Sequence, residues 1–387
     1  MATRKPISLA KGKDNYAVTW PDEPPRFTED TIDPFLLWSV KKGASDISLQ
    51  SDRPIYHELD GVLYPGTYRP LDAADMAAIL QRIYGPEAQA RLASGNDLDL
   101  SYEIRPDRYT RIRFRVNITA ILSKGRDAAQ VTMRVLPNEP PSMKDLNIEE
   151  DIIKNWAPRQ GIVIITGPTG SGKTTLLAAG NRMILERPHG CGKMLTYEAP
   201  IEYVYDVVKS PRSLVAQTEI PRHLPDFAKG VRNALRRKPN IILVGEARDK
   251  ETISAAIEAA QTGHAVYTTT HTTGVAATVQ RMITSFDAAE RSERAYALME
   301  TLRMVVTQML VPKKNGGRMG VREWMKFPDE VREKLLDMDF IEWPPVIQRM
   351  MPNYGQTMNV SAGKAFDAGL IDRRWYLILT NSTGGGG

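Results

Sequence analysis

The sequence has few of the features that mark a specialised class of protein. Its 387 residues include one cysteine, Cys191, so an internal disulfide framework is excluded and a reducing compartment is indicated. No apolar run approaches the roughly 18 residues of a membrane span, and the basic N-terminus lacks the apolar stretch of a secretory signal. We therefore expect no transmembrane segment, and any membrane association should come through a partner.

The chain also has only a small excess of one sign of charge over the other. The chain carries 51 basic and 46 acidic side chains, for a net charge of +5. An excess this small permits an anionic partner but does not argue for one, and no groove of aromatic and basic residues is visible, so nucleic acid is not expected as a direct ligand. A hydrophobic content of 42% fits a globular chain, and the length allows two or three domains.

What the sequence does contain is a phosphate-binding loop, GPTGSGKTT. Its glycines allow successive backbone N–H groups to face a phosphate, Lys173 can reach the β- and γ-phosphates, and the Thr174 hydroxyl suits Mg²⁺. The apolar run 161–166 before it predicts a strand, and the Leu- and Ala-rich stretch 174–187 after it predicts a helix. The loop therefore predicts ATP binding. Its expected nucleotide contacts are Gly167, Thr169, Gly170, Ser171, Gly172, Lys173, Thr174 and Thr175.

Two further apolar strands end in a carboxylate. Glu246 follows the run 241–244, and Glu198 follows the run 193–197. Ligands of parallel sheets bind beyond the carboxyl ends of the strands. We therefore expect Glu246 to lie near the γ-phosphate and to hold Mg²⁺ through water, and Glu198 to polarise the attacking water. Glu202 is either part of this set or a loop charge.

Histidines flank a third strand. His271 stands at its end, where the side chain can contact the γ-phosphate. His264 stands at its start and is expected to be structural. Seven residues apart on a strand, the two rings face opposite sides, so they do not share a metal.

The pattern along the chain predicts four parts. Residues 1–32 are a polar, proline-bearing extension, 33–136 a small α+β domain, and 137–148 a proline-rich linker. In residues 149–387, strands alternate with helices, which implies an α/β domain with a parallel sheet. The pattern stays helical from 287 to about 311, so we expect a helical C-terminal part.

Four motifs in order carry a family resemblance. GPTGSGKTT, EAPIE, ILVGEARD and TGHAVYTTTHTT follow one another as in the PilT/GspE-type secretion ATPases, and the resemblance extends over roughly residues 40–375. Within that family, the segment from Gly316 to Phe327 and the proline-bearing extension resemble the type IVB secretion and plasmid-conjugation ATPases of the DotB/TraJ type. In place of the usual Glu-Asp-Pro-Ile-Glu, the second motif has Ala199 as its second residue, which leaves more of the catalytic role to Glu198.

The resemblance implies a PAS-like N-terminal domain, a RecA-like ATPase domain and a homohexameric ring that docks on secretion or conjugation proteins at the cytoplasmic face of the inner membrane. It also implies that Arg113, Arg115 and, less directly, Arg126 approach the nucleotide, where a guanidinium can neutralise transition-state charge. From the residues alone, the alternation of arginines with apolar side chains predicts only a solvated strand face.

Three other functions compete with this interpretation. A type IV pilus retraction motor would use the same chemistry. A nucleic-acid translocase would require a basic binding surface, and a small-molecule kinase would require an acceptor pocket. The sequence shows neither of the last two features.

Overall fold

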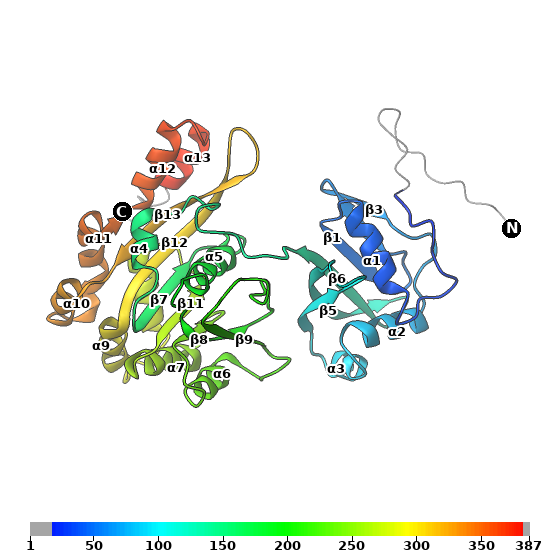
Figure 1. Ribbon diagram of the computed structural model, residues 1–387, viewed down its shortest axis with the longest axis horizontal. Helices are drawn as coiled ribbons and strands as arrows, with labels where there is room; N and C mark the ends of the chain where they lie inside the picture. The colour runs from blue at the N-terminus through cyan, green and yellow to red at the C-terminus, as the bar shows by residue number, and fades with distance from the viewer. Residues whose placement is uncertain (1–17, 382–387) are drawn as a thin grey trace. The chain divides into compact units, whose positions relative to one another are not determined.

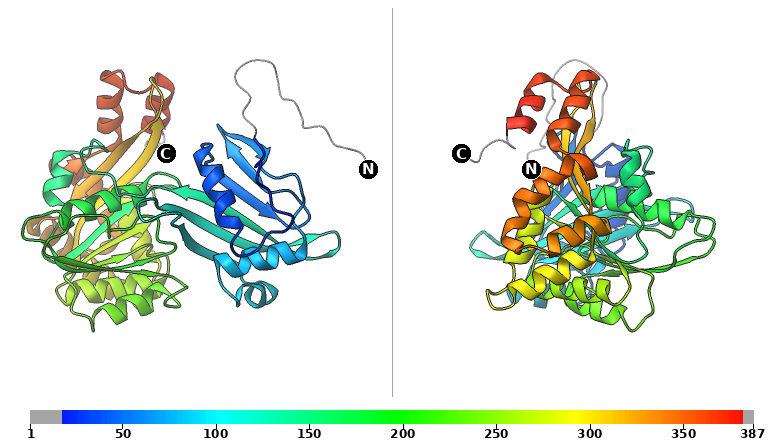
Figure 2. Two further views of the ribbon diagram at one scale, coloured as in Figure 1. Left: turned by 45° about the vertical axis from the view of Figure 1, so that its right-hand side comes forward. Right: turned by 90° about the vertical axis from the view of Figure 1, so that its left-hand side faces the viewer.

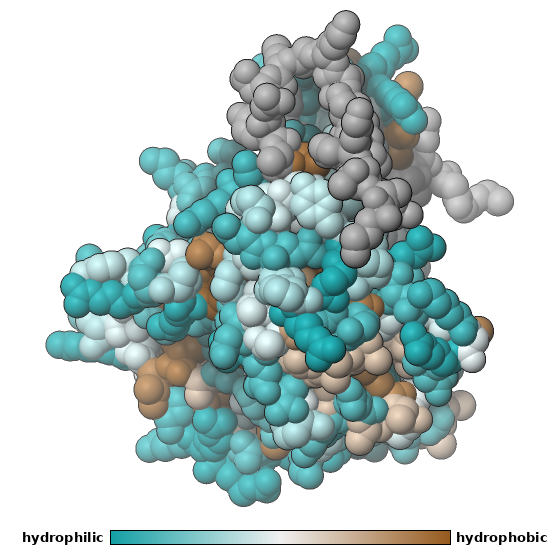
Figure 3. Space-filling view, turned by 90° about the vertical axis from the view of Figure 1, so that its right-hand side faces the viewer, coloured by the Kyte–Doolittle hydropathy of each residue, from teal (hydrophilic) through white to brown (hydrophobic). Residues whose placement is uncertain are grey.

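Two sheets organise the chain, one on each side of the boundary between Leu136 and Pro137. The structure is a computed structural model that describes residues 18–381 (Figure 1). Among these residues no helix is long and apolar enough to cross a membrane. The face drawn in Figure 3 is mostly hydrophilic, with small separate hydrophobic patches.

The first unit is an antiparallel sheet of six strands in the order β3-β2-β1-β6-β5-β4. In β5 the alternating residues Phe114, Val116 and Ile118 are fully buried, so this face of the strand belongs to the core. Helix α2 begins at Asp72, whose carboxylate accepts the backbone N–H of Asp75 in a capping box. The elements are α1 (Ile32–Lys41), β1 (Asp46–Gln50), β2 (Tyr56–Leu59), β3 (Val62–Pro65), α2 (Ala73–Ile83), α3 (Ala88–Ala93), β4 (Leu98–Ile104), β5 (Ile112–Ser123) and β6 (Arg126–Leu136).

The core of this unit begins before residue 33, the boundary expected from the sequence. Trp20, Phe27 and Ile32 are buried in the same hydrophobic cluster as Phe35. Residues 18–32 are therefore part of the folded unit, because their large apolar side chains cover one side of α1. The remainder of the expected extension, 1–17, lies outside the described residues.

The second unit contains a mixed sheet of eight strands in the order β14-β13-β12-β7-β11-β10-β8-β9. Strands β12, β7, β11, β10, β8 and β9 are parallel, β13 runs antiparallel to β12, and β14 runs antiparallel to β13. Every residue of β7 is buried, because one hydrophobic cluster covers each face of the sheet. The elements are α4 (Glu150–Asn155), β7 (Gly161–Thr166), α5 (Lys173–Leu185), β8 (Gly192–Glu198), β9 (Ser213–Glu219), α6 (Phe227–Ala234), β10 (Ile241–Val244), α7 (Lys250–Gln261), β11 (Ala265–Thr270), α8 (Val275–Thr284), α9 (Arg291–Thr301), β12 (Leu302–Pro312), β13 (Arg318–Lys326), α10 (Asp329–Leu336), the 3₁₀ turn η1 (Phe340–Glu342), α11 (Trp343–Tyr354), β14 (Gly355–Gln356), α12 (Met358–Asp367) and α13 (Arg373–Asn381).

The helical pattern expected from 287 to 311 is wrong in its second half. Helix α9 ends at Thr301, and β12 then pairs with β7 on one side and β13 on the other. A short apolar run fits either a helix or a buried strand, and here the open edge of β7 decides. Beyond β13 the chain is mainly helical, and Figures 1 and 2 show α12 and α13 beside the far end of the β12–β13 hairpin.

The segment expected to be a linker is anchored to the second unit along part of its length. Met143 and Ile148 are buried against α4 and α5. The Arg182 guanidinium donates to the Pro140 carbonyl oxygen at 2.6 Å. The residues 137–139, directly after Leu136, are exposed.

Candidate ATP-binding site

The phosphate loop joins the buried strand β7 to helix α5. Gly167, Gly170 and Gly172 have φ values of +139°, +76° and +81°, in the region that favours glycine. A Cβ on Gly167 would lie 2.2 Å from the Gln308 carbonyl oxygen, so glycine is also required for close packing. No side chain caps the first turn of α5, whose N–H groups therefore remain available to an anion.

Lys173 is buried at the base of this loop. Its Nζ donates to the carbonyl oxygens of Gly167 at 2.7 Å and Pro168 at 3.1 Å. Burial lowers the pKa of the Lys173 ammonium, and the charges of Glu246 and Glu202 oppose that shift. A bound phosphate fits here, because its charge would replace weak contacts to carbonyl oxygens with a full ion pair. The Ser171 hydroxyl is buried and has no hydrogen-bond partner within the described part of the chain, which leaves a donor for the same anion.

Three predicted residues meet beside the loop. The His271 Nδ1 lies 3.4 Å from the Lys173 Nζ, and its Nε2 lies 3.2 Å from the Glu246 Oε1. Since an ammonium can only donate, His271 accepts at Nδ1 and donates from Nε2 to the carboxylate when the ring is neutral. The imidazole therefore bridges the cation of the loop and the carboxylate that follows β10.

Threonine side chains hold His271 in place. The Thr166 hydroxyl at the end of β7 bonds the carbonyl oxygen of Thr272, and the hydroxyls of Thr270 and Thr272 lie 2.8 Å apart. On the next strand, Thr269 donates to the Gly245 carbonyl oxygen at 2.6 Å. These contacts join the carboxyl ends of β7, β11 and β10, so that residues distant in the sequence converge at one edge of the sheet.

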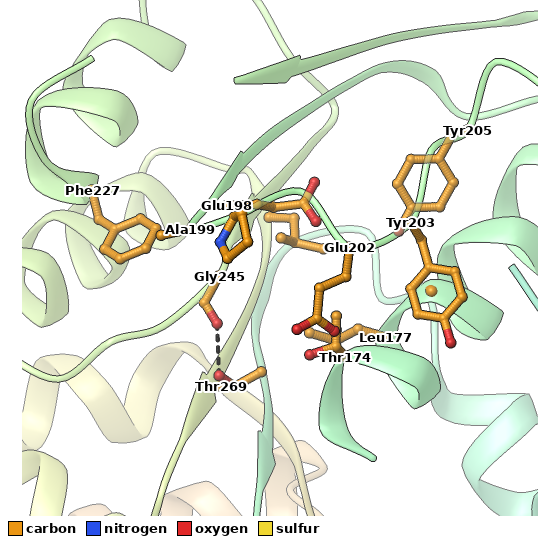
Figure 4. A pocket seen from close by; sticks show the side chains of 13 residues that line it. Thr174, Leu177, Glu198, Ala199, Glu202, Tyr203, Tyr205, Phe227, Gly245 and Thr269 are labelled. Atoms are coloured by element: carbon orange, nitrogen blue, oxygen red, sulfur yellow. Dashed lines mark hydrogen bonds between the residues drawn. The ribbon is translucent and has the colours of Figure 1, made fainter. Parts of the chain in front are cut away.

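Glu198 and Glu202 line a pocket with Thr174 (Figure 4). Glu198 is buried, and its Oε1 accepts the Thr196 hydroxyl at 2.6 Å and the Gln217 amide at 3.0 Å. In Figure 4 the Glu202 side chain extends toward Thr174. The sequence left Glu202 as a second carboxylate or a loop charge, and the structure places it in the pocket.

The pocket suits a cation that is held mainly by phosphate. Within residues 18–381 no group of three or more His, Cys, Asp or Glu side chains could hold a metal ion alone. Mg²⁺ commonly takes one or two protein ligands, with water and substrate phosphate completing the shell. Thr174 lines the pocket with a hydroxyl group, which fits that requirement.

Other loop residues have different surroundings. Thr169 and Gly170 are exposed at the tip. The Thr175 hydroxyl lies 3.2 Å from the Tyr203 hydroxyl, so it faces the loop that follows β8 and carries Glu202. His264 lies at the start of β11, with Nδ1 3.0 Å from the Ala259 carbonyl oxygen, which fits a structural role.

The three candidate arginines belong to the first unit, and the structure does not bring them together. Arg113 is buried near the start of β5, with Nε 3.7 Å from the Glu103 Oε2. Arg115 lies opposite Arg134 in the β5–β6 pairing. Arg126 lies across the turn from Ser123, where its guanidinium donates to Asp52 at 3.2 Å. The Lys124 hydrogen bond, followed by that of Ser123, lowers the pKa of the Asp52 carboxyl.

Sequence reasoning missed Gln308. This buried side chain of β12 donates from Nε2 to the Ser171 carbonyl oxygen at 2.7 Å, directly behind the phosphate loop. Gln308 follows Thr307 in the mainly apolar run 302–311, for which the sequence predicts a helix, so nothing in the run marks Gln308 as a contact of the phosphate loop.

Comparison with known proteins identifies the family. The family model described as "Type II/IV secretion system protein" matches residues 24–335. The type IV pilus retraction ATPase PilT of Pseudomonas aeruginosa is 33% identical over 342 residues, which are 88% of this chain and 96% of PilT. The Legionella pneumophila ATPase DotB is 47% identical, with a TM-score of 0.90 over 94% of this chain and 98% of DotB. A structure of the pilus retraction motor PilT with bound ADP has 29% identity and a TM-score of 0.76, over 89% of this chain and 95% of that one. The chain therefore belongs to the type II/IV secretion system ATPase family, with a RecA-like P-loop domain preceded by a PAS-like domain.

Proposed function

We propose that this chain is a Mg²⁺-dependent ATP hydrolase that works as a homohexamer and powers a type IVB secretion or plasmid-conjugation machine from the cytoplasmic face of the inner membrane. The observation that carries the hydrolase is the meeting of Lys173, His271 and Glu246 beside a phosphate loop. The similarity to DotB, at 47% identity over 94% of the chain, supports the choice of machine.

Each residue has a chemical task in this proposal. ATP supplies the phosphoanhydride bond, and Mg²⁺ neutralises part of its charge. Lys173 leaves the loop carbonyl oxygens to bind phosphate, and Thr174 provides a hydroxyl ligand. Glu246 orients water and accepts a hydrogen bond from His271 Nε2, which keeps the proton on that nitrogen. His271 Nδ1 can then accept a hydrogen bond from Lys173 or lose it when Lys173 moves to the phosphate. Glu198 accepts a proton from water, and Glu202 adds negative charge near Thr174.

Two substitutions test the hydrolase. Lys173→Ala should abolish nucleotide binding, because the buried cation is lost. Glu246→Gln should leave ADP binding largely intact and lower turnover at least about a hundredfold, the usual size of a lost acid–base or water-orienting group. Glu251→Gln, an exposed residue in the first turn of α7, is the matched control. Normal turnover of Glu246→Gln would remove Glu246 from its role.

The ring is tested by mass. Light scattering on the full chain with and without Mg-ATP should give a particle of about six chains in at least one condition. A monomer in every condition would leave the hydrolase and remove the ring. The nucleotide dependence shows whether ATP binding builds the assembly.

A pilus retraction motor is the second candidate, because PilT matches 88% of the chain at 33% identity. Purified chain should be retained by inner-membrane components of a type IVB machine and not by a pilus platform protein. Retention by the platform protein alone would favour the retraction motor. Neither result alters the hydrolase assignment.

A further inference from the structure

A chain of buried polar groups runs away from the back of the phosphate loop. The Gln308 amide donates to the Ser171 carbonyl oxygen at 2.7 Å, and Arg322 Nε donates to Gln308 Oε1 at 2.8 Å. Gln308 and Arg322 lie directly opposite each other in β12 and β13, and their exposed fractions are 4% and 3%. The loop backbone therefore rests on a side-chain pair from β12 and β13, the two strands that follow β7 on one side of the sheet.

The other end of this pair reaches the segment that precedes α4. Arg322 Nη1 donates to the Glu149 carboxylate at 3.1 Å and the Asn147 carbonyl oxygen at 3.3 Å, and Nη2 donates to the Leu146 carbonyl oxygen at 3.2 Å. This segment follows shortly after the first unit ends at Leu136. We call Ser171, Gln308, Arg322 and Glu149 the relay.

Close packing supports the relay as a built feature. A Cβ on Gly320 would lie 2.6 Å from Arg322 Nη2 and 3.0 Å from Gln308 Oε1. A Cβ on Gly172 in the phosphate loop would lie 2.9 Å from Gln308 Nε2. Glycines on both sides therefore leave the space that the two polar side chains occupy.

Stability alone does not account for this arrangement. Burial lowers the pKa of Arg322, which means that its charge is poorly solvated even beside Glu149. Buried ion pairs are often replaced by apolar residues at little cost to stability. The arginine instead satisfies four acceptors from two different parts of the unit, and no apolar residue could link them.

We propose that Arg322 is a positioning residue that, through Gln308, couples the phosphate loop to residues 146–149. Holding the Ser171 carbonyl oxygen turns it away from the phosphate side and fixes the loop N–H groups. Nucleotide binding and anchoring of residues 146–149 should then strengthen each other, since coupling between two sites is reciprocal. The inference rests on the nucleotide site of the proposed function.

Glu149→Gln provides the sharpest test, because this carboxylate does not touch the loop and is 27% exposed. It should weaken ADP binding to the full chain by about three- to tenfold, the net contribution of one ordinary hydrogen bond. Glu150→Gln, the adjacent and 87% exposed carboxylate that pairs with Lys154, should leave ADP affinity unchanged. Arg322→Lys keeps the positive charge but loses the planar guanidinium that donates to several acceptors at once, and it should weaken ADP binding at least as much. Arg303→Lys is its control, because this β12 arginine donates to the nearby carbonyl oxygens of Glu300 and Leu302.

Hydrogen exchange provides a readout that a purely structural role would not change. ADP should increase amide protection at 146–149 in the wild type, and this increase should disappear in Gln308→Leu. Equal ADP affinity in folded Glu149→Gln, Arg322→Lys and wild type would overturn the relay. Failure of the wild type to bind ADP would instead overturn the nucleotide site, and the relay with it.

Discussion

Gln217 of β9 binds both Glu198, at the end of β8, and the loop that follows and carries Glu202. Its Nε2 donates to Glu198 Oε1 at 3.0 Å and to the Tyr203 carbonyl oxygen at 2.9 Å. Its Oε1 accepts the Tyr205 N–H at 3.0 Å. Gln217→Leu keeps a similar volume and removes all three hydrogen bonds, so it separates the packing of β9 from the positioning of the loop.

The magnitude follows from these contacts. Each hydrogen bond contributes about 1 kcal/mol net, and each partner left without water or protein contacts costs somewhat more. We expect a loss of about 2–4 kcal/mol in the free energy of unfolding. The Thr196 hydroxyl still holds Glu198 at 2.6 Å, so turnover should fall about tenfold and not completely. Nucleotide affinity should change little, because Lys173 and the phosphate loop keep their contacts.

Three measurements on one preparation test this prediction: urea denaturation, ADP affinity by calorimetry, and turnover by phosphate release. Gln261→Leu, an exposed glutamine at the end of α7, is the control for adding an apolar side chain. Gln217→Glu should be worse for turnover, because a second carboxylate would face Glu198. A destabilised Gln217→Leu with normal turnover would refute the argument, since Glu198 would then not need to be positioned.

Three further predictions follow from other parts of the structure. A Cβ on Gly180 would lie 1.9 Å from the Trp156 ring, so Gly180→Ala should lower the free energy of unfolding by about 1–3 kcal/mol. Adding Trp156→Phe should recover part of this loss. Equal stability of Gly180→Ala and wild type in urea would contradict this packing. Burial lowers the pKa of His57, so near pH 6.5 the unfolded chain takes up a proton at this ring more readily than the folded chain does. The free energy of unfolding should therefore fall as the pH drops below that value. His57→Gln should remove this pH dependence in denaturation measured from pH 7.5 to 5. Chelation of Mg²⁺ should stop phosphate release while ADP still protects the phosphate loop from hydrogen exchange, and turnover in excess EDTA would exclude the metal.

The sequence was most informative where a short stretch determines its own structure. The strands expected at 161–166 and 241–244 are β7 and β10, because short apolar runs that are rich in β-branched residues and bounded by turn signals favour a strand buried in a sheet. The structure of the phosphate loop is likewise determined by nearby residues, namely its spaced glycines and the helix that follows. The strand ends that bring Glu246 and His271 together followed from parallel-sheet topology.

The sequence was least informative where distant residues decide the structure. The run 302–311 contains the β-branched residues Val305, Val306 and Thr307, which favour a strand. No glycine or proline separates it from the helical pattern before it, so pairing with β7 settles its structure. Gln308 and Ser171 are 137 positions apart, so nothing in either neighbourhood predicts their hydrogen bond. The first unit likewise begins earlier than its composition suggested, because Trp20 and Phe27 are buried in one cluster with residues of α1 and of the sheet, which come later in the chain.

The candidate arginines illustrate how geometry constrains a role taken from resemblance. Arg113 and Ser123 stand near opposite ends of β5, and Arg126 pairs with Ser123 across the turn. At about 3.3 Å per residue along a strand, Arg113 and Arg126 are separated by about 30 Å. One nucleotide cannot contact both arginines of a single hairpin. If both act on nucleotide, they therefore act at different nucleotides.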